Sequence, residues 1–330
     1  MNSFIDLIKS SKKIAIFSHI NPDADALCSS IALKKIIDNN FDDKFIDVFT
    51  DGEIGKLYAP ILRNDVINPK PFSSYDLAIV LDCPNIARIG KYQEMYKTIE
   101  KSVNIDHHGT NERFALVNCA SPKVSSTCEM IYLLAHSLKL ELNKDIAKLL
   151  YQGILTDTNC FTSNTMTAKT HFVLNELLSY KFNSNLIKEY YFSNQSLDKT
   201  MLEAKTLKNI KLYKNKSIAL MKITNNDLTK NNVSFDDTMG IVDKGLSIEG
   251  VMICIVLIEK EPNVIHASIR GKGTEVDVST LAKEFGGGGS PTVAAFQYKG
   301  DMKELEQSIL SYIKEEADEL NLDPDEKQLF

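Results

Sequence analysis

The sequence lacks the features of a membrane-spanning, secreted or disulfide-built protein. Its longest apolar run, Val251–Ile258, is too short to cross a bilayer, and Met1–Lys13 has no apolar core like that of a signal peptide. The six cysteines are scattered over 330 residues and form no C-x-x-C pair, which is typical of reduced thiols. We therefore expect a cytoplasmic protein without a membrane partner.

The chain also lacks an excess of basic residues. Asp and Glu number 44 against 38 Lys and Arg, for a formal net charge of −6. Proteins that wrap long nucleic acid normally carry a basic face, because neutralisation of phosphates dominates their affinity. The charge balance argues against a long duplex as partner. Short single-stranded oligonucleotides and small nucleotides remain candidate partners.

What is present is an ordinary globular composition, 43% apolar and 25% charged, in which strands and helices alternate through the first half. Apolar strands separated by helices are typical of a parallel, doubly wound sheet. Ser126 or Ser125 is a candidate N-cap, and Glu129 would complete a capping box with Ser126. The predicted strands cover residues 13–17, 45–49, 77–81 and 102–105, and the predicted helices cover residues 26–37, 89–100, 125–138, 144–154 and 168–178.

After a polar helical stretch the pattern changes. The predicted strands of the second half cover residues 217–223, 251–257 and 264–270, and the predicted helices cover residues 278–285 and 302–320. We therefore predict two α/β domains. An N-terminal doubly wound parallel-sheet domain spans residues 1–184, a helical linker spans 185–205, and a smaller α/β domain spans 206–330.

Acidic residues and histidines gather where the first-half elements end. In open α/β sheets, ligands bind beyond the carboxyl ends of the strands, so these residues are expected to converge. Pro22 favours an extended loop, in which Asp23 and Asp25 would point to the same side. The residues of this set are His19, Asp23, Asp25, Asp82, Asp106, His107, His108 and Asp157.

Crowded carboxylates repel one another unless cations neutralise them, which indicates divalent metal ions. Mixed carboxylate and imidazole ligands suit Mn²⁺, and Mg²⁺, Co²⁺ and Zn²⁺ are compatible with the same ligand types. Two such ions about 3.5–4 Å apart would bind phosphate oxygens, activate water and stabilise the leaving oxygen.

Taken singly, each residue has a simpler interpretation. Asp25 before a helix could be an N-cap or a first-turn acid, and Asp82 before Pro84 could be a turn residue. His19 could be a hydrogen-bonded loop histidine. Gly286–Gly289 could be a helix C-cap followed by a loop, and it is no Walker A loop because no lysine follows in place. The set as a whole, in this order, favours the metal site.

These motifs resemble those of the DHH phosphoesterases. The resemblance is carried by Ser18–Ala26, Asp82, Asp106–His108 and Asp157, while Ser268–Ala295 resembles the DHHA1 partner domain. Within the family the chain is most similar to the NrnA type, which degrades very short oligonucleotides and dephosphorylates 3′-phosphoadenosine 5′-phosphate (pAp).

The resemblance implies a role for each matching residue. Implied metal ligands are His19, Asp23, Asp25, Asp82, His107 and Asp157, with Asp82 bridging both ions. Implied catalytic residues are His108, Asp82 and Asp106, the last orienting a histidine. Implied substrate contacts are His108, Arg270, Gly287, Gly288, Gly289 and Ser290. Ser290 stands where the family usually has histidine, so a weaker or shifted substrate preference is expected.

The expected activity is that of a metal-dependent phosphodiesterase or phosphomonoesterase. By two-metal activation of water it would hydrolyse short oligonucleotides (nanoRNA, dinucleotides), pAp, or both. Two alternatives stay open: a cyclic or linear dinucleotide phosphodiesterase, and a catalytically weakened nucleotide-binding sensor. The sequence leaves a homodimer open as well.

Overall fold

The computed structural model describes residues 2–62, 65–163, 165–273 and 276–315. The chain forms two compact units, which divide between Asn194 and Gln195. This division falls inside the stretch predicted as a helical linker. Each unit is described by itself below.

The first unit is built on a five-stranded sheet in the order β2-β1-β3-β4-β5, in which all neighbours are parallel. The strands are β1 (Lys13–Phe17), β2 (Phe45–Phe49), β3 (Leu77–Leu81), β4 (Ser102–Asp106) and β5 (Val117–Ala120). The predicted doubly wound parallel sheet is confirmed. Only β5 was not expected, because its sequence VNCA is short and half-buried and has no apolar run.

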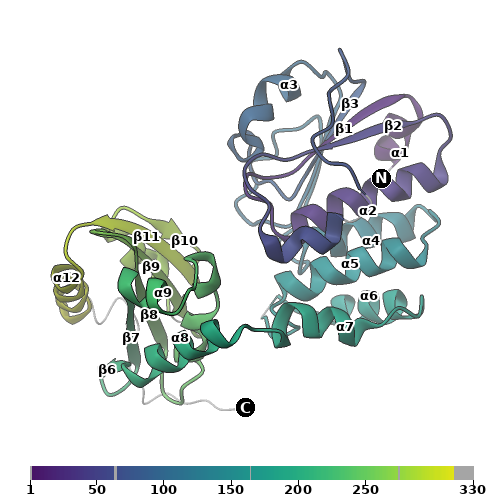
Figure 1. Ribbon diagram of the computed structural model, residues 1–330. Coiled ribbons are helices and arrows are strands. Elements are labelled where there is room, and N and C mark those ends of the chain that lie inside the picture. Colours follow the sequence, from purple (N-terminus) through teal and green to yellow (C-terminus); the bar gives the residue numbers. More distant parts are fainter. Residues whose placement is uncertain (1, 63–64, 164, 274–275, 316–330) are drawn as a thin grey trace. The chain divides into compact units, whose positions relative to one another are not determined.

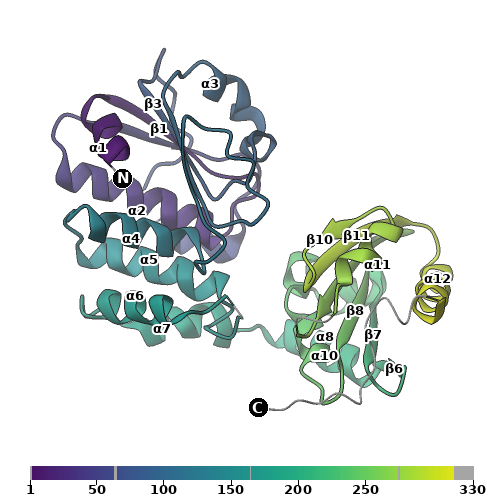
Figure 2. The same cartoon turned by 180° about the vertical axis from the view of Figure 1, so that it is seen from behind.

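Helices cover both faces of this sheet because each central strand is apolar on both sides. Ile14 and Ile16 of β1 pack with the long helices, while Ala15 and Phe17 pack toward the opposite face with Tyr96. The helices of the unit are α1 (Asn2–Lys9), α2 (Ala24–Asn40), α3 (Gln93–Lys97), α4 (Thr127–Ser137), α5 (Lys144–Asp157), α6 (Ala168–Leu178) and α7 (Ser184–Lys188). Figures 1 and 2 show α4 and α5 beyond α2, with α6 and α7 forming a further layer.

The prediction of one continuous helix in this half is wrong. Residues 89–100 were expected to form a single helix, but the chain makes a 3₁₀ turn over Ile86–Tyr92 and then the short helix α3. Gly90 has a φ of 66°, in the left-handed region, which interrupts helical geometry. The other predicted helices of this half are found with small shifts at their ends.

The second unit contains a six-stranded mixed sheet in the order β10-β11-β9-β8-β7-β6, in which only β7 and β8 pair in parallel. The strands are β6 (Lys211–Tyr213), β7 (Ile218–Ile223), β8 (Ile253–Glu261), β9 (Val264–Gly271), β10 (Gly288–Gly289) and β11 (Val293–Lys299). This confirms the predicted α/β character of the second half. The short edge strands β6 and β10 and the seven-residue strand β11 were not predicted.

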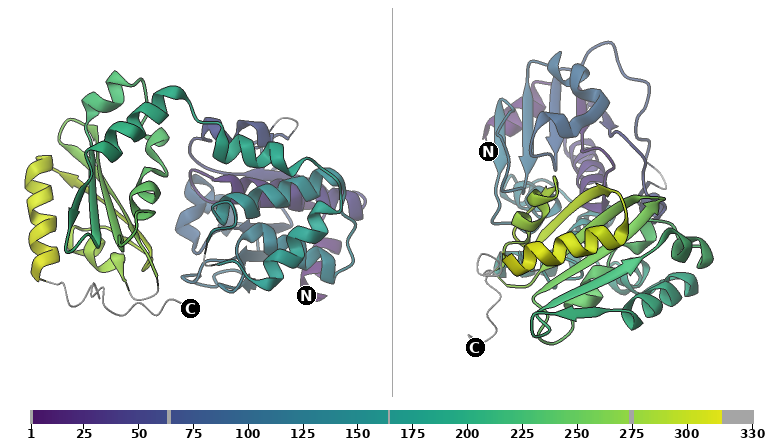
Figure 3. Two further views of the ribbon diagram at one scale, coloured as in Figure 1. Left: turned by 90° about the horizontal axis from the view of Figure 1, so that it is seen from below. Right: turned by 90° about the vertical axis from the view of Figure 1, so that its left-hand side faces the viewer.

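Helices flank both faces of the second sheet as well. α8 (Leu197–Lys208), α9 (Asn225–Lys230) and α10 (Ile241–Leu246) pack on one face, and α11 (Val278–Glu284) and α12 (Met302–Glu315) pack on the other. Figure 3 shows α12 lying along its face of the sheet. Residues 316–320 of the predicted last helix lie outside the described residues. Within the described ranges, no helix combines the length and apolarity needed to cross a bilayer.

Glu306 fastens α12 to the sheet edge. Its side chain is buried and accepts hydrogen bonds from Lys211 Nζ at 2.8 Å and Lys222 Nζ at 2.6 Å. Burial alone would raise the pKa of this carboxyl, but the two lysine bonds override it and lower the pKa below its usual range. A lowered pKa means that the contribution to stability is present above the unfolded-state pKa and is lost as the pH falls through the folded-state pKa.

We expect Glu306→Gln to destabilise the second unit by roughly 1–2 kcal/mol at neutral pH, because both lysines lose their partner but can turn toward water. The difference from wild type should shrink as the pH falls through the folded-state pKa of Glu306. Urea unfolding at pH 7 and below pH 4 measures it. Glu304→Gln, an exposed change on the same helix, is the control. Equal stability of Glu306→Gln and wild type at pH 7 would contradict this role.

Candidate active site

The first-half acids and histidines lie at the switch point of the first sheet. His19 follows β1 and Asp82 follows β3, and these two strands are neighbours in the sheet although the chain passes through β2 between them. Asp106 is the last residue of β4, so His107 and His108 extend beyond the same edge. Asp157 reaches this edge from the end of α5. Residues far apart in the sequence therefore converge where open α/β sheets bind ligands.

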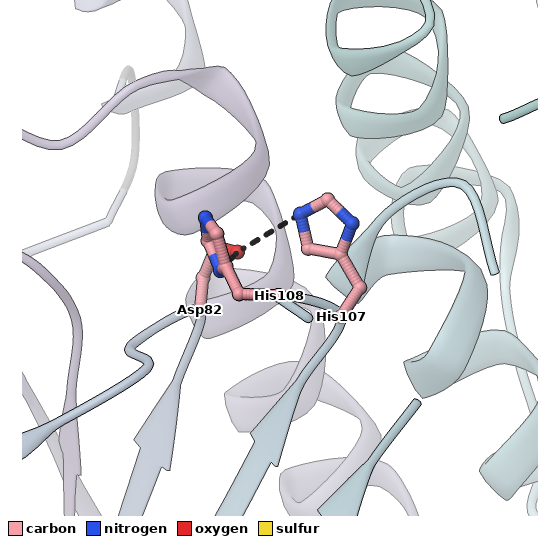
Figure 4. A group of neighbouring side chains, drawn as sticks. All are labelled: Asp82, His107 and His108. Atoms are coloured by element: carbon pink, nitrogen blue, oxygen red, sulfur yellow. Dashed lines mark ion pairs between the residues drawn. The ribbon is translucent and has the colours of Figure 1, made fainter. Parts of the chain in front are cut away.

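Asp82 stands at the centre of this group. Its Oδ2 lies 3.6 Å from His19 Nε2, and its Oδ1 lies 3.5 Å from His107 Nε2 and 3.7 Å from His108 Nδ1. Figure 4 shows the two histidines and the aspartate pointing toward one another from the ends of β3 and β4. Asp82 is buried and its φ is 57°, in the left-handed region. Burial of its side chain against three histidines, more than its backbone conformation, argues against an ordinary turn residue.

Asp23 and Asp25 reach the site in a way that the sequence did not predict. The expected extended loop is wrong, because α2 begins at Ala24 and Asp25 lies in its first turn. Asp23 is the N-cap, and its Oδ1 accepts from Ala26 N at 3.0 Å. The cap role proposed for Asp25 thus belongs to Asp23. Asp23 also faces His19, with 3.8 Å between Oδ1 and Nε2.

Hydrogen bonds fix how two of the histidines point. His19 Nδ1 lies 2.9 Å from the Ile20 carbonyl oxygen, which can only accept, so Nε2 is the atom turned toward the carboxylates. His108 Nδ1 lies 2.6 Å from Oδ1 of the fully buried Asp106, whose Oδ2 accepts from Asn111 Nδ2 at 2.6 Å. Asp106 thus makes the contact expected of an orienting carboxylate.

The pKa values of the group reveal a surplus of buried negative charge. Burial and the charge of Asp82 raise the pKa of both Asp25 and Asp157 well above the ordinary value. Burial opposes protonation of His19, but its bonds with Asp23 and Asp82 raise its pKa to about 10. In the same way, burial is outweighed at Asp82, whose bond with His19 lowers its pKa to about 2. The raised pKa values of His19, Asp25 and Asp157 mean that bound protons offset part of the repulsion between the carboxylates, as bound cations would.

The donor atoms fit divalent cations. Three groups of potential ligands occur among the described residues, and within each group the ligand atoms lie within 4.8 Å of one another. The groups are His19–Asp23–Asp82, Asp25–His107–Asp157 and Asp82–His107–His108. Asp82 and His107 each appear in two of them. Oxygen and imidazole donors are those that Mn²⁺ and related ions prefer.

The predicted contacts of the second unit meet at one end of its sheet. Val293 of β11 pairs with Arg270 of β9 and also hydrogen-bonds with Ser290 in the hairpin turn. The Arg270 side chain is partly exposed, and its Nε lies 3.7 Å from Asp243 Oδ1. The exposed Ser290 hydroxyl lies within hydrogen-bond distance of the backbone of this turn.

The glycine run is only partly the cap and loop considered above. Gly286, with a φ of 76°, follows α11 as a C-cap glycine, but Gly288 and Gly289 form strand β10. A Cβ on Gly287 would lie 2.2 Å from the Ala295 carbonyl oxygen, so the approach of β11 requires glycine there. The run therefore builds a tight hairpin.

Sequence reasoning missed residues that contact the site without belonging to it. Asn104 accepts from Asn111, which in turn bonds Asp106, and Thr127 donates to Asp82. Asn104 stands between Val103 and Ile105 in a predicted strand, and a polar residue between two apolar ones was the available signal. Thr127 follows the predicted N-cap Ser126, and the sequence alone assigned it no role in the site.

Comparison with known proteins agrees with this arrangement. The DHH family, N-terminal domain, matches residues 13–154, and the DHHA1 domain matches residues 215–319. The chain is 30% identical over 285 residues to the probable bifunctional oligoribonuclease and PAP phosphatase NrnA of Streptococcus mutans, covering 86% of this chain and 89% of that protein. It is 27% identical over 283 residues to the bifunctional oligoribonuclease and PAP phosphatase NrnA of Bacillus subtilis, covering 84% and 87%.

A solved structure shows the same fold. The crystal structure of an exopolyphosphatase-related protein from Bacteroides fragilis superimposes with a TM-score of 0.86 at 27% identity, covering 94% of this chain and 95% of that one. Fold, site and relatives together define a hydrolase of the phosphoesterase class. The chain belongs to the DHH family, with a DHHA1 domain, and is NrnA-like.

Proposed function

We propose that the protein hydrolyses phosphate esters of small nucleotides, with short oligonucleotides and pAp as substrates, and that it depends on two divalent metal ions. The observation that carries the proposal is the convergence of carboxylates and imidazoles around Asp82 at the switch point of the first sheet. The names of the similar proteins from S. mutans and B. subtilis support the substrate classes.

When bound, the two ions would hold phosphate oxygens, activate a water molecule and stabilise the leaving oxygen. His19 and Asp23 would bind one ion, and Asp25, His107 and Asp157 the other, with Asp82 between them. Mn²⁺ is the ion that these donors suit best.

His108 is proposed to contact the phosphate and to carry a proton to the leaving group. Its side chain is 41% exposed, so a substrate can reach it, while Asp106 holds its Nδ1 and leaves Nε2 free. Burial lowers the pKa of His108, but the bond with Asp106 and the charge of Asp82 raise it to about 8, which favours a ring that can donate a proton. In the second unit, Arg270 is proposed to bind a substrate phosphate through its planar guanidinium.

A substrate panel with Mn²⁺ tests the proposal. We expect phosphate release from pAp and mononucleotide release from diribonucleotides and pApA, with activity removed by EDTA and restored by Mn²⁺. Preference for cyclic dinucleotides would instead support a cyclic-dinucleotide phosphodiesterase. Metal-dependent binding without turnover of any substrate would replace the enzyme with a nucleotide sensor.

A further inference from the structure

We propose that Thr127, the first residue of α4, is a positioning residue that fixes Asp25 and Asp82 for metal binding. The inference deepens the proposed function, since it rests on these two aspartates being metal ligands. Its evidence is a set of contacts that join one helix end to two carboxylates from distant parts of the chain.

The backbone of Thr127 and its neighbour holds Asp25. Thr127 N donates to Asp25 Oδ2 at 2.7 Å, and Cys128 N donates to Asp25 Oδ1 at 3.0 Å. Both carboxylate oxygens are therefore bound by the first turn of α4, where the free N–H groups and the helix dipole favour negative charge. Two bonds to one rigid helix end fix the plane of the carboxylate and leave its remaining lone pairs for a cation.

The side chain of Thr127 holds Asp82. Thr127 Oγ1 donates to Asp82 Oδ1 at 2.9 Å, and this is the same oxygen that faces His107 and His108. Both partners of this bond are buried, Thr127 fully, so water cannot replace the hydroxyl without rearrangement. Thr127 therefore bonds both Asp82, which faces three histidines, and Asp25, which belongs to the group Asp25–His107–Asp157.

Capping of α4 does not account for the Thr127 hydroxyl. Ser126 already serves as N-cap, since its Oγ accepts from Glu129 N at 3.1 Å. The Glu129 carboxylate bonds Ser125 N instead of Ser126 N, so the predicted capping box is only half formed. Because Ser126 already caps α4, the bond from Thr127 to Asp82 is not needed for capping. We assign it to positioning Asp82.

The segment before Thr127 is itself held in place. Glu129 Oε2 accepts from Ser125 N at 3.0 Å, Ser125 Oγ at 2.6 Å and Thr170 Oγ1 at 2.9 Å. Thr170 belongs to the capping box that starts α6. Hydrogen bonds of buried Glu129 thus tie residues 125–129 to the start of α6, and Thr127 of the same segment bonds both aspartates. This support can hold the ligands before any cation arrives.

The test compares Thr127→Val with Thr127→Ser by calorimetric titration with Mn²⁺ alone. Loss of the hydroxyl in Thr127→Val should weaken Mn²⁺ binding about 10- to 100-fold, as measured for other partners of metal ligands. Thr127→Ser keeps the donor and should bind within a few-fold of wild type. Thr206→Val is the matched control, because Thr206 is also buried but donates only within α8, and its Mn²⁺ affinity should equal that of wild type.

Thermal unfolding in EDTA separates positioning from folding. A folded Thr127→Val variant that binds Mn²⁺ like wild type would overturn the proposal, and so would a Thr127→Ser variant as weak as Thr127→Val. If Thr127→Val does not fold, Thr127→Ala removes the same hydroxyl without placing a methyl group beside Asp82, and the same comparison applies. Because Mn²⁺ binding is measured without nucleotide, failure of every substrate would refute the proposed function and leave this result standing.

Discussion

Asp82→Asn should abolish hydrolysis while leaving the fold intact. The substitution keeps the size of the side chain, and asparagine tolerates the left-handed backbone that Asp82 adopts. It removes a carboxylate that faces all three of His19, His107 and His108. Loss of a charged ligand shared by two ions removes several kcal/mol of transition-state stabilisation, so kcat/KM should fall on the order of 10³-fold or more. Steady-state hydrolysis of pAp and of a diribonucleotide measures the loss.

The same variant should lose the stabilisation that metal gives to the wild type. A ligand that binds only the folded state at a hundredfold excess over its Kd stabilises by about 2.7 kcal/mol, so Mn²⁺ should raise the Tm of the wild type and hardly that of Asp82→Asn. Asp145→Asn makes the same charge change at an exposed position of α5 and should behave as wild type. Turnover by Asp82→Asn close to that of wild type would rule out a bridging role.

The sequence predicted the parts of this site that depend on strand ends. β1, β3 and β4 each have an acid or a histidine at their end or within two residues after it, and a parallel sheet brings such ends to one edge. The convergence of His19, Asp82 and His107 could therefore be inferred from chain order alone. The matching motifs of the DHH family made the inference sharper.

What the sequence could not predict depends on how helices pack. That Asp25 turns from the first turn of α2 toward the start of α4 follows from the packing of those two helices, and no local pattern encodes it. Strand β5 was missed for a related reason, since its pairing with β4 is decided by the neighbouring strand and its own sequence is half polar. The path of the chain near Gly90 was missed because a single left-handed residue interrupts an otherwise helical sequence.

Gly153→Ala should impair the site more than it impairs the fold. Gly153 lies in α5 where that helix meets the start of α4, and a Cβ there would lie 2.2 Å from Cys128 Sγ and 2.7 Å from Asp25 Oδ1. Neither neighbour can move away freely, because Cys128 and Asp25 are both buried and Asp25 is bound by the α4 amides. The added methyl group must therefore displace Asp25 or push α4 away from it.

Two opposing terms set the effect of Gly153→Ala on stability. Alanine is favoured over glycine inside a helix by about 1 kcal/mol, whereas overpacking a buried contact costs about 1–3 kcal/mol. We expect a net loss of about 1 kcal/mol, together with a fall in kcat/KM on the order of 100-fold, because misplacement by about 1 Å has that effect on a reacting centre. Urea unfolding in EDTA, Mn²⁺ titration and hydrolysis of pAp measure the three quantities.

Gly245→Ala is the control for Gly153→Ala, because it adds a similar steric clash at a position away from the proposed metal ligands. Gly245 lies in α10 of the second unit, and a Cβ there would lie 2.5 Å from Cys254 Sγ and 2.7 Å from Met221 Cε, so the crowding against a buried thiol is similar. The atoms nearest to that Cβ belong to Cys254 and Met221, neither of which is a proposed metal ligand. Gly245→Ala should lose a similar amount of stability and keep the Mn²⁺ affinity of the wild type. If both variants bind Mn²⁺ equally well, the close approach of α5 to Asp25 does not position the ligand, and Gly153 serves packing alone.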